Sequence, residues 1–531
     1  MLLGPILGLE NDTFYSVIFA SEQKYEEAEL KLVLSSVDLS FKAKCSSVFE
    51  LHSTWVYKFI FSVEPTVGNM EVNYEIQAFG TPILDQDGNK AWKFVVPGKE
   101  SVPKIGFASC NGNGKKLPTP KDSADYIMWD KLYQSHLTED EPYAFHCLIL
   151  GGDQIYADPI WKSISYFKNH KLLSKRSSKK MMSHKISDKD RPELISQIEA
   201  FYENLYISSW SMPAVARVLS SIPSIMMWDD HDIFDGWGSQ PSGLQKSEIF
   251  QLIFKIAKKY FEVFQIRGGS NTSRISKDHY TLQLRFRNFE IFALDNRSKR
   301  TSDVVMSSEQ YDELNRYLSR ELFVDAPEPL QREKVLLFAI AVPIAHLNYK
   351  ERTEKVLKWQ RHHNYRYSLN DDATDHWGHA NHQVERERLL EYIYDLADHS
   401  NPKYVHIISG DVHSAGYGRI EKESDDGVRK INEFISSPIV YKPVGKFFQL
   451  MLSLLSDKKS DIEGYNIGIR PLGYGNKEAK VIYEKNFPCF FKEKNQGLRT
   501  FYTFEHQTET DQGHQGTLYF HPTELRDQLI S

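Results

Sequence analysis

Apolar and polar positions alternate through the first part of this 531-residue chain, and a period of two is typical of β-strands. Turn-forming residues separate the alternating runs, as in the Asp-Gln-Asp-Gly-Asn segment that begins at Asp85. Short strands between such turns favour a small antiparallel β-sandwich, and we predict one over residues 1–98. Its predicted strands are Phe14–Ala20, Leu30–Leu34, Trp55–Phe61 and Val72–Ile76.

The pattern changes after a linker at Pro97–Ser101, because apolar runs then alternate with longer amphipathic segments. This change predicts an α/β catalytic domain over residues 99–445, with a largely parallel or mixed sheet covered on both faces. We expect residues 446–531 to form a β-rich extension packed on the core. The predicted strands are Lys104–Ser109, His146–Leu150, Ser224–Trp228, Phe289–Leu294, Val335–Ala341 and Tyr404–Ser409. The predicted helices are Pro192–Ser208, Ser247–Phe264, Ser307–Glu321 and Gln383–Ala397.

Three of these strands lead directly into loops rich in carboxylates. The loops are Gly151–Tyr156, Trp228–Asp232 and Gly410–His413. Open α/β sheets place ligands and chemistry at the carboxyl ends of their strands. Clustered carboxylates repel one another unless cations lie between them, so the three loops together predict a polynuclear metal centre.

The ligand types in these loops suit such a centre. Asp153, Asp230 and Asp411 are oxygen donors at strand ends, and His413 adds a nitrogen donor two positions after Asp411. We expect Asp153 to bridge two cations, because one carboxylate between them neutralises both. His231, next to Asp230, is suited to polarise or protonate an oxygen that the metals do not hold. The sequence therefore predicts a metal-assisted hydrolase.

Two further strand ends contribute candidate residues. Cys110 follows the strand at Lys104–Ser109, where a thiol is either a buried structural residue or a thiolate ligand. Arg297 lies two residues after Asp295. Its guanidinium is suited to grip a phosphate through two parallel hydrogen bonds, or to be held by Asp295 in an ordinary ion pair. The two interpretations of Arg297 are compatible.

The order of these motifs resembles that of the PhoD-type alkaline phosphatases, a branch of the calcineurin-like metallophosphoesterases. The matching motifs are Ser-Cys, Gly-Asp-x-Ile-Tyr, Asp-Asp-His-Asp, Leu-Asp-x-Arg and Gly-Asp-x-His, within residues 100–440. The segment Asp375–Trp377 and the pair Glu385 and Arg386 also match the family's late pattern. The resemblance implies a four-layer α/β/β/α core preceded by the β-sandwich domain.

The resemblance also implies a ligand set. Cys110, Asp153 and Tyr156 would hold a ferric ion, and further carboxylates would hold calcium ions. Asp230, Asp411 and His413 would complete the metal shell. Secreted members of the family usually carry Glu at the place of Asp232 and Asn shortly after it, so Asp235 and Gly236 of this chain depart from the pattern at the calcium sites. Zn²⁺, Mn²⁺ and Mg²⁺ therefore remain alternatives to Fe³⁺ and Ca²⁺.

The expected activity is that of a phosphoric ester hydrolase acting on phosphate monoesters, with diesters left open. A metal-bound hydroxide would attack phosphorus in line, and Arg297 would bind the substrate and absorb charge. His231 would bind the leaving oxygen and protonate it. One alternative is a phosphodiesterase or phospholipase-type enzyme acting on lipid or nucleotide diesters. A second alternative is a catalytically degenerate protein that binds a partner.

Composition excludes some partners. With 65 Lys and Arg against 71 Asp and Glu, the net charge is -6, so no overall field draws the chain to nucleic acid or membranes. We expect a small phosphate ester as partner, with no nucleic acid, no membrane insertion and no obligate protein. The apolar start, Met1–Asn11, is short and lacks basic residues, which favours a cytoplasmic protein without a secretory signal and leaves specialised secretion open.

One basic segment departs from this charge balance. Residues 161–191 include the run Lys175–Lys180. The preferred interpretation is a solvated loop, and the alternative is a basic lid beside an anionic substrate.

Overall fold

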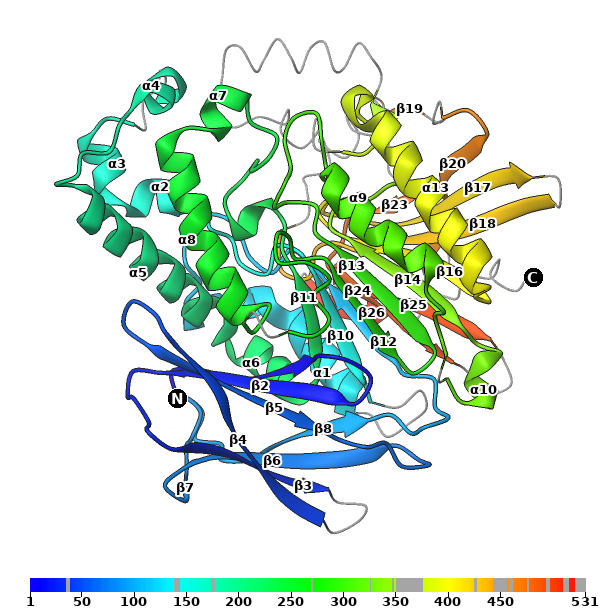
Figure 1. The fold of residues 1–531 in the computed structure, drawn as a ribbon, viewed down its shortest axis with the longest axis horizontal. Coiled ribbons are helices and arrows are strands. Elements are labelled where there is room, and N and C mark those ends of the chain that lie inside the picture. The colour runs from blue at the N-terminus through cyan, green and yellow to red at the C-terminus, as the bar shows by residue number, and fades with distance from the viewer. Residues whose placement is uncertain are drawn as a thin grey trace.

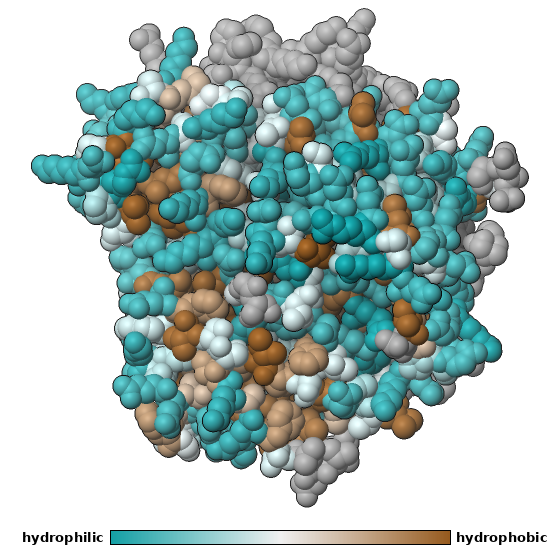
Figure 2. Space-filling view, viewed as in Figure 1, coloured by the Kyte–Doolittle hydropathy of each residue, from teal (hydrophilic) through white to brown (hydrophobic). Residues whose placement is uncertain are grey.

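The protein has a mixed α/β fold built on two large β-sheets with helices around them (Figure 1). The computed structural model describes residues 1–34, 39–137, 144–172, 177–268, 271–324, 326–345, 348–349, 376–424, 427–442, 456–457, 462–474, 477–492, 497–509 and 515–520. Hydrophilic side chains dominate the face seen in Figure 2, and hydrophobic ones gather mainly in its lower half and at its left side.

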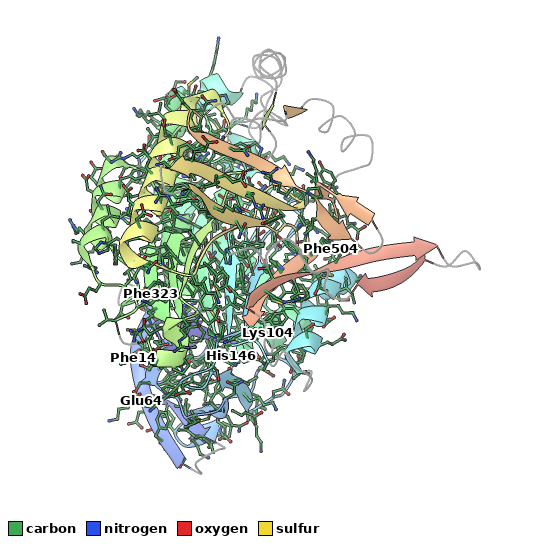
Figure 3. The ribbon with its side chains drawn as sticks, turned by 90° about the vertical axis from the view of Figure 1, so that its right-hand side faces the viewer. Phe14, Glu64, Lys104, His146, Phe323 and Phe504 are labelled. Carbon is green, nitrogen blue, oxygen red and sulfur yellow. The ribbon has the colours of Figure 1, made fainter. Side chains whose placement is uncertain are left out.

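Three parallel strands form the centre of the first sheet. They are β9 (Ile105–Ala108), β10 (Cys147–Gly151) and β11 (Ser224–Met227), and every residue in them is buried. Burial on both faces explains why they read as continuous apolar runs. At the start of β9 and β10, the backbone N–H of Lys104 donates to Nδ1 of His146 at 2.9 Å, and Figure 3 shows the two residues close together.

The two ends of the chain extend this sheet. Strand β1 (Leu3–Leu9) pairs in parallel with β11, and β24 (Asn486–Lys492) pairs antiparallel with β9. Two further strands continue beyond β24, namely β25 (Leu498–Glu509) and β26 (Gln515–Phe520). The sequence prediction missed β1, because Gly and Pro interrupt its apolar pattern.

The other strands of the N-terminal region are all antiparallel. They are β2 (Phe14–Ser21), β3 (Ala28–Leu34), β4 (Leu39–Glu50), β5 (Trp55–Ser62), β6 (Met70–Ala78), β7 (Thr81–Pro82) and β8 (Trp92–Val96). The four strands predicted from the sequence match β2, β3, β5 and β6, whereas β4, β7 and β8 were missed. One half of β4 pairs with β5 and the other half pairs with β3, so β4 joins two groups of strands. Side chains of the two groups meet, as Tyr15 on β2 and Phe94 on β8 have ring centroids 5.2 Å apart.

The second sheet has four adjacent parallel strands. They are β13 (Phe289–Leu294), β14 (Val335–Ile340), β16 (Tyr404–Ser409) and β18 (Gly427–Ile435). Antiparallel strands complete this sheet: β12 (Leu282–Phe286), β17 (Ala415–Ser424), β20 (Tyr465–Arg470) and β23 (Val481–Ile482). The two sheets contact each other through β10 and β14, and His406 on β16 stacks on Phe490 of β24 with centroids 5.9 Å apart.

Within the described residues, six longer helices flank the sheets. They are α1 (Ile127–Leu137), α5 (Arg191–Trp210), α6 (Pro213–Ser221), α8 (Glu248–Phe264), α9 (Ser308–Asn315) and α13 (Gln383–Ser400). Apolar residues of α8 recur every three or four positions, and that face is buried. The four predicted helices match α5, α8, α9 and α13, except that α9 ends early and continues as the 3₁₀ helix η3 (Arg316–Ser319). Helices α9 and α13 lie beside the second sheet, and α6 packs on β1 (Figure 1).

Short elements connect these parts. The helices are α2 (Ile160–Ser163), α3 (Ser165–Asn169), α4 (Ser177–Ser183), α7 (Ser242–Gln245) and α10 (Glu328–Gln331). The 3₁₀ helices are η1 (Pro120–Tyr126), η2 (Asp230–Asp232) and η4 (Ala380–His382). The remaining short strands are β15 (Asn348–Tyr349), β19 (Ser456–Asp457), β21 (Leu472–Tyr474) and β22 (Lys477–Ala479). Among the described residues, no helix combines the length and apolar character needed to cross a membrane.

Candidate metal centre

Four strand ends bring the candidate ligands together. Cys110, Asp153 and Asp230 follow the neighbouring parallel strands β9, β10 and β11, so they emerge at one edge of the first sheet. Asp411 and His413 follow β16 of the second sheet. Ligand atoms lie within 4.8 Å of one another in three groups: Cys110, Asp153 and His413; Asp153, Asp230 and His231; and Asp153, Asp229, Asp230 and Asp411. Asp153 belongs to all three groups.

Two glycines allow the loops to approach this closely. Gly152 has φ +95°, and a Cβ there would lie 2.7 Å from the Cβ of Asp229. A Cβ at Gly410 would lie 2.5 Å from Oγ of Ser109. The glycine of each Gly-Asp motif therefore meets a steric need of the site, because a larger residue would push two ligand loops apart.

Four candidate ligands have left-handed backbone conformations, which only a few per cent of non-glycine residues adopt. Their φ angles are +57° at Cys110, +53° at Asp153, +63° at Asp411 and +49° at His413. Such conformations cost about 1–3 kcal/mol each and cluster at active sites and ligand clamps. Their convergence on one spot indicates a site whose geometry matters for function.

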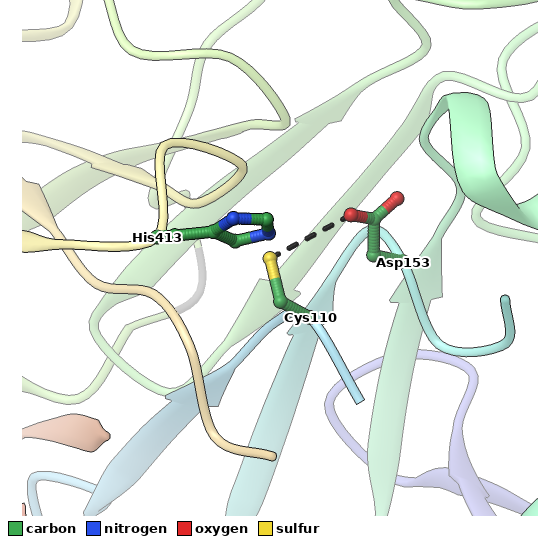
Figure 4. A group of neighbouring side chains, drawn as sticks. All are labelled: Cys110, Asp153 and His413. Carbon is green, nitrogen blue, oxygen red and sulfur yellow. Dashed lines mark hydrogen bonds between the residues drawn. The ribbon is translucent and has the colours of Figure 1, made fainter. Parts of the chain in front are cut away.

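A sulfur, a phenol, a carboxylate and an imidazole surround one point (Figure 4 shows three of them). Sγ of Cys110 lies 3.6 Å from Oδ2 of Asp153. The hydroxyl of Tyr156 lies 3.2 Å from the same oxygen and 3.4 Å from Nε2 of His413. Ligands of one metal ion are about 3–4 Å apart when each lies about 2 Å from the metal, so this spacing fits a bound cation.

Burial and like charges govern the ionisation of this cluster. Burial raises the pKa of the Cys110 thiol well above its usual value, and nearby Asp153 adds to the effect. Burial also raises the pKa of Asp153, which His231 opposes and Asp229 reinforces. Burial lowers the pKa of His413 to about 3, which keeps its imidazole neutral. A cation would favour the thiolate and the carboxylates, and it needs a neutral imidazole.

His231 lies beside the carboxylate cluster and is oriented by a residue that the sequence analysis did not name. Its Nδ1 lies 2.8 Å from Oδ2 of Asp158, whose Oδ1 accepts the backbone N–H of Asp235 at 2.9 Å. The His231 ring also stacks on Tyr156, with centroids 4.3 Å apart. The pKa of His231 is raised well above its usual value, because Asp158 and Asp230 together outweigh the opposite effect of burial.

The Arg297 side chain has contacts beyond the ion pair considered from the sequence. Asp295 accepts backbone N–H groups, including that of Arg297 at 3.0 Å, and an Asp295–Arg297 side-chain pair stays a prediction. The Arg297 guanidinium donates to Asp229 and, at 3.1 Å, to the carbonyl of Trp237. Arg297 is fully buried, and these contacts support a role in holding the second acidic loop. Direct contact of Arg297 with a substrate stays a prediction.

Replacing Arg297 with Ala is expected to lower the free energy of unfolding by about 3–5 kcal/mol, because Asp229 would be left as a buried charge without its guanidinium partner. Urea unfolding of the purified protein measures this loss. The double variant Arg297→Met with Asp229→Asn should recover part of it. A raised KM with unchanged stability would instead favour Arg297 as a substrate ligand.

Asp232 has a structural place in the second acidic loop. Its Oδ1 accepts from the backbone N–H groups of Gln154 and Ile155 at 3.1 and 3.2 Å and from the Gln265 side chain at 2.8 Å. Its Oδ2 accepts the N–H of Asp229 at 2.8 Å. Asp232 therefore ties the first acidic loop to the second. These hydrogen bonds hold the second acidic loop in place, which is the loop in which the chain departs from the family pattern.

Two residues after β18 also contact the centre, and no local pattern in the sequence identified them. Oγ of Ser437 lies 2.8 Å from Sγ of Cys110. The Tyr441 ring stacks on His413 with centroids 4.1 Å apart and on Tyr156 with centroids 5.4 Å apart. Tyr441 thus supports two of the candidate ligands. Asp229 had a signal, since it lies in the second acidic loop, whereas Asp158 lies two residues after the end of the first.

The late motif lies partly outside the described residues, because Asp375 does. His376 and Trp377 are buried. Glu385 accepts the backbone N–H groups of Val305 and Met306 at 2.7 and 2.6 Å. The Glu385 contacts join α13 to the segment before α9, which is a structural role.

The fold and the clustered acidic loops define a metallophosphoesterase-like α/β protein. Comparison with known proteins identifies its family. A family model described as "PhoD related phosphatase" matches residues 83–356, which is more than half of the chain. The chain belongs to the PhoD-related phosphatase family, which confirms the resemblance found in the sequence. The matched range contains Cys110, Asp153 and Asp230, whereas Asp411 and His413 lie beyond it.

Individual relatives are distant. The chain is 22% identical over 516 residues to the uncharacterised protein YGR266W of Saccharomyces cerevisiae, covering 83% of this chain and 70% of the relative. The solved structure of PhoD covers 99% of this chain and 93% of its own, with 14% identity and a TM-score of 0.51. A purple acid phosphatase from yellow lupin (Lupinus luteus) seeds covers 99% and 75%, with 9% identity and a TM-score of 0.47. The likeness to PhoD concerns the fold.

Proposed function

We propose that this protein is a metal-dependent phosphoesterase that hydrolyses phosphate monoesters, and that the centre around Asp153 carries the activity. One observation carries the proposal: the Asp153 carboxylate is buried at the meeting point of all three candidate ligand groups. Its Oδ1 has no hydrogen-bond partner among the described residues. A buried carboxylate oxygen without a donor is costly unless a cation binds it.

The donor set fits more than one cation. Cys110, Tyr156 and His413 around Oδ2 of Asp153 would hold one ion, and their sulfur, phenol and imidazole donors suit ferric iron better than calcium. Asp229, Asp230 and Asp411 offer oxygen donors for a second ion, of the type that calcium, magnesium or manganese prefers. Asp153 would bridge the two.

Bound metal ions would activate water and stabilise charge on the phosphoryl group. The chain's own groups supply the rest. His231, held through Nδ1 by Asp158, is placed to donate a proton from Nε2 to the leaving oxygen. Arg297 holds Asp229, and Asp232 and Gly152 keep the first two loops together. This preorganisation keeps the ligands in place before substrate binds.

The division of the chain into domains and the layering of its catalytic domain belong to the same proposal. Two facing sheets with helices beside them support a four-layer α/β/β/α order for residues 99–445. The antiparallel strands β2 to β8 support a β-sandwich domain that ends at residue 98. Strands β24 to β26 support a C-terminal extension that lengthens the edge of the first sheet.

Metal removal tests the proposal. Protein purified without chelator is expected to contain metal and to hydrolyse an aryl phosphate. Chelation should abolish hydrolysis, and adding back iron with calcium should restore it, because the buried carboxylates need cations. A bis-aryl phosphate assayed in parallel separates monoester from diester preference. Metal-loaded protein that hydrolyses neither compound would favour a binding protein, and hydrolysis that survives complete metal removal would contradict the proposal.

A further inference from the structure

The basic segment singled out in the sequence forms a charged arm that leaves the candidate metal centre directly. We call residues 160–190, as far as they are described, the basic arm. It comprises α2, α3 and α4 and begins two residues after Asp158, which contacts His231. Trp161 anchors its base by packing on Phe234, which follows the second acidic loop, with centroids 5.1 Å apart.

The surface of this arm carries strong positive charge. Its seven exposed lysines are Lys162, Lys168, Lys171, Lys179, Lys180, Lys185 and Lys189. The arm has only two acidic residues, Asp188 and Asp190, and no ion pair links any of the seven lysines to another described residue. The whole chain has a net charge of -6, so this positive charge is local.

Internal packing holds some of these lysines close together. The Tyr166 ring stacks on His170 with centroids 3.9 Å apart, and its hydroxyl lies 2.8 Å from Nε2 of His184. The Lys180 ammonium donates to the carbonyl of His170. These contacts join α3 to the middle of α4 and to the residue that follows α4, so Lys171 and Lys180 share one region of surface. Figure 1 places α3 and α4 at a corner of the molecule, where Figure 2 shows hydrophilic side chains projecting.

We propose that the basic arm docks the protein on an anionic lipid bilayer and so brings the candidate metal centre close to phosphate esters at that surface. Clustered lysines complement the negative surface potential of such a membrane. Met182 on α4 is 43% exposed and adds an apolar side chain among the lysines. Docking on the bilayer does not depend on the proposed hydrolysis. The role of docking in bringing the metal centre close to its substrate rests on the proposed function.

A lipid surface fits the arm better than a nucleic acid does. Proteins that bind single-stranded nucleic acids combine basic grooves with exposed aromatic rings on which bases stack. Among the described residues of the arm, Tyr166 and Phe167 are buried and Trp161 is packed against other rings. The arm therefore presents charge without a stacking platform.

Vesicle sedimentation tests the docking with the full-length protein. Binding is expected to vesicles of phosphatidylcholine mixed with phosphatidylserine, and not to phosphatidylcholine alone. Each lysine near an anionic surface contributes roughly fivefold to binding. The quadruple variant Lys168→Gln, Lys171→Gln, Lys179→Gln and Lys185→Gln should therefore bind at least about tenfold more weakly. It leaves the contact of Lys180 with His170 in place.

A second quadruple variant is the matched control. Lys24→Gln, Lys90→Gln, Lys277→Gln and Lys430→Gln remove the same charge from exposed positions outside the arm. This control should bind the vesicles as the unmodified protein does. Vesicle binding of the control and of the unmodified protein should weaken as added salt shortens the screening length from about 10 Å at 0.1 M to about 3 Å at 1 M. Thermal unfolding checks that both variants fold, and hydrolysis of a soluble aryl phosphate should be unchanged in both.

Three results would overturn the proposal. They are no binding to the mixed vesicles, equal loss of binding in the arm variant and the control, and arm-dependent binding of a single-stranded oligonucleotide in place of vesicles. Failure of hydrolysis with intact vesicle binding would count against the proposed function alone.

Discussion

The Asp153→Asn variant is expected to lose at least about a thousandfold in turnover, equivalent to about 4 kcal/mol of transition-state stabilisation, while its fold survives. Asn is close to Asp in size and tolerates the left-handed backbone that Asp153 adopts, with φ +53°. Asn removes the charge that would bind two cations at once. The rate of aryl phosphate hydrolysis and the bound metal content should therefore fall together.

Stability gives the Asp153→Asn experiment its second readout. Burial and the neighbouring carboxylates disfavour the charged form of Asp153, so removing that charge should not lower the unfolding temperature of chelated protein. Asp87→Asn, in an exposed N-terminal turn, is the matched control and should keep metal and activity. Metal-containing Asp153→Asn protein with normal turnover would refute the assignment of the centre. Collapse of the fold would show that Asp153 is mainly structural.

The strands that carry the centre were predictable because burial on both faces leaves a direct signal in the sequence. The apolar runs before Asp153, Asp230 and Asp411 become β10, β11 and β16, with ends within two residues of the predicted ones. The order of strands along the chain does not by itself show which strands are neighbours in a sheet. The convergence of these loops was nevertheless predictable, because each acidic loop follows a buried strand and parallel strands present their carboxyl ends at one edge.

Other parts of the site depend on contacts between distant segments and leave no local pattern. Ser437 and Tyr441 reach the centre because the second sheet faces the first, which no period in their own segment encodes. Strand β1 was missed for a local reason, since Gly and Pro interrupt its apolar pattern, and its pairing with β11 joins residues more than two hundred positions apart. The contact of Arg297 with Asp229 likewise joins residues 68 positions apart, which no local pattern encodes.

Replacing His231 with Gln is expected to slow turnover by about a hundredfold to ten-thousandfold while the metal content stays unchanged, because Gln cannot donate a proton as imidazolium does. The loss should grow as the leaving group becomes more basic, since a poor leaving group depends more on protonation. A series of aryl phosphates of increasing phenol pKa measures this dependence. Gln is long enough to reach Asp158, which limits the structural disturbance.

Asp158→Asn provides the companion measurement, because Oδ2 of Asp158 orients the His231 ring and the Asn carbonyl oxygen can still accept the backbone N–H of Asp235. Oδ2 of Asp158 lies 2.8 Å from Nδ1 of His231, so the variant should lose part of the same rate and show the same dependence on the leaving group. The double variant should be little slower than His231→Gln alone, since both changes act on one proton transfer. His231 also lies in one candidate ligand group with Asp153 and Asp230. If His231→Gln lost metal in proportion to its activity, with no dependence on the leaving group, His231 would be a ligand rather than the proton donor.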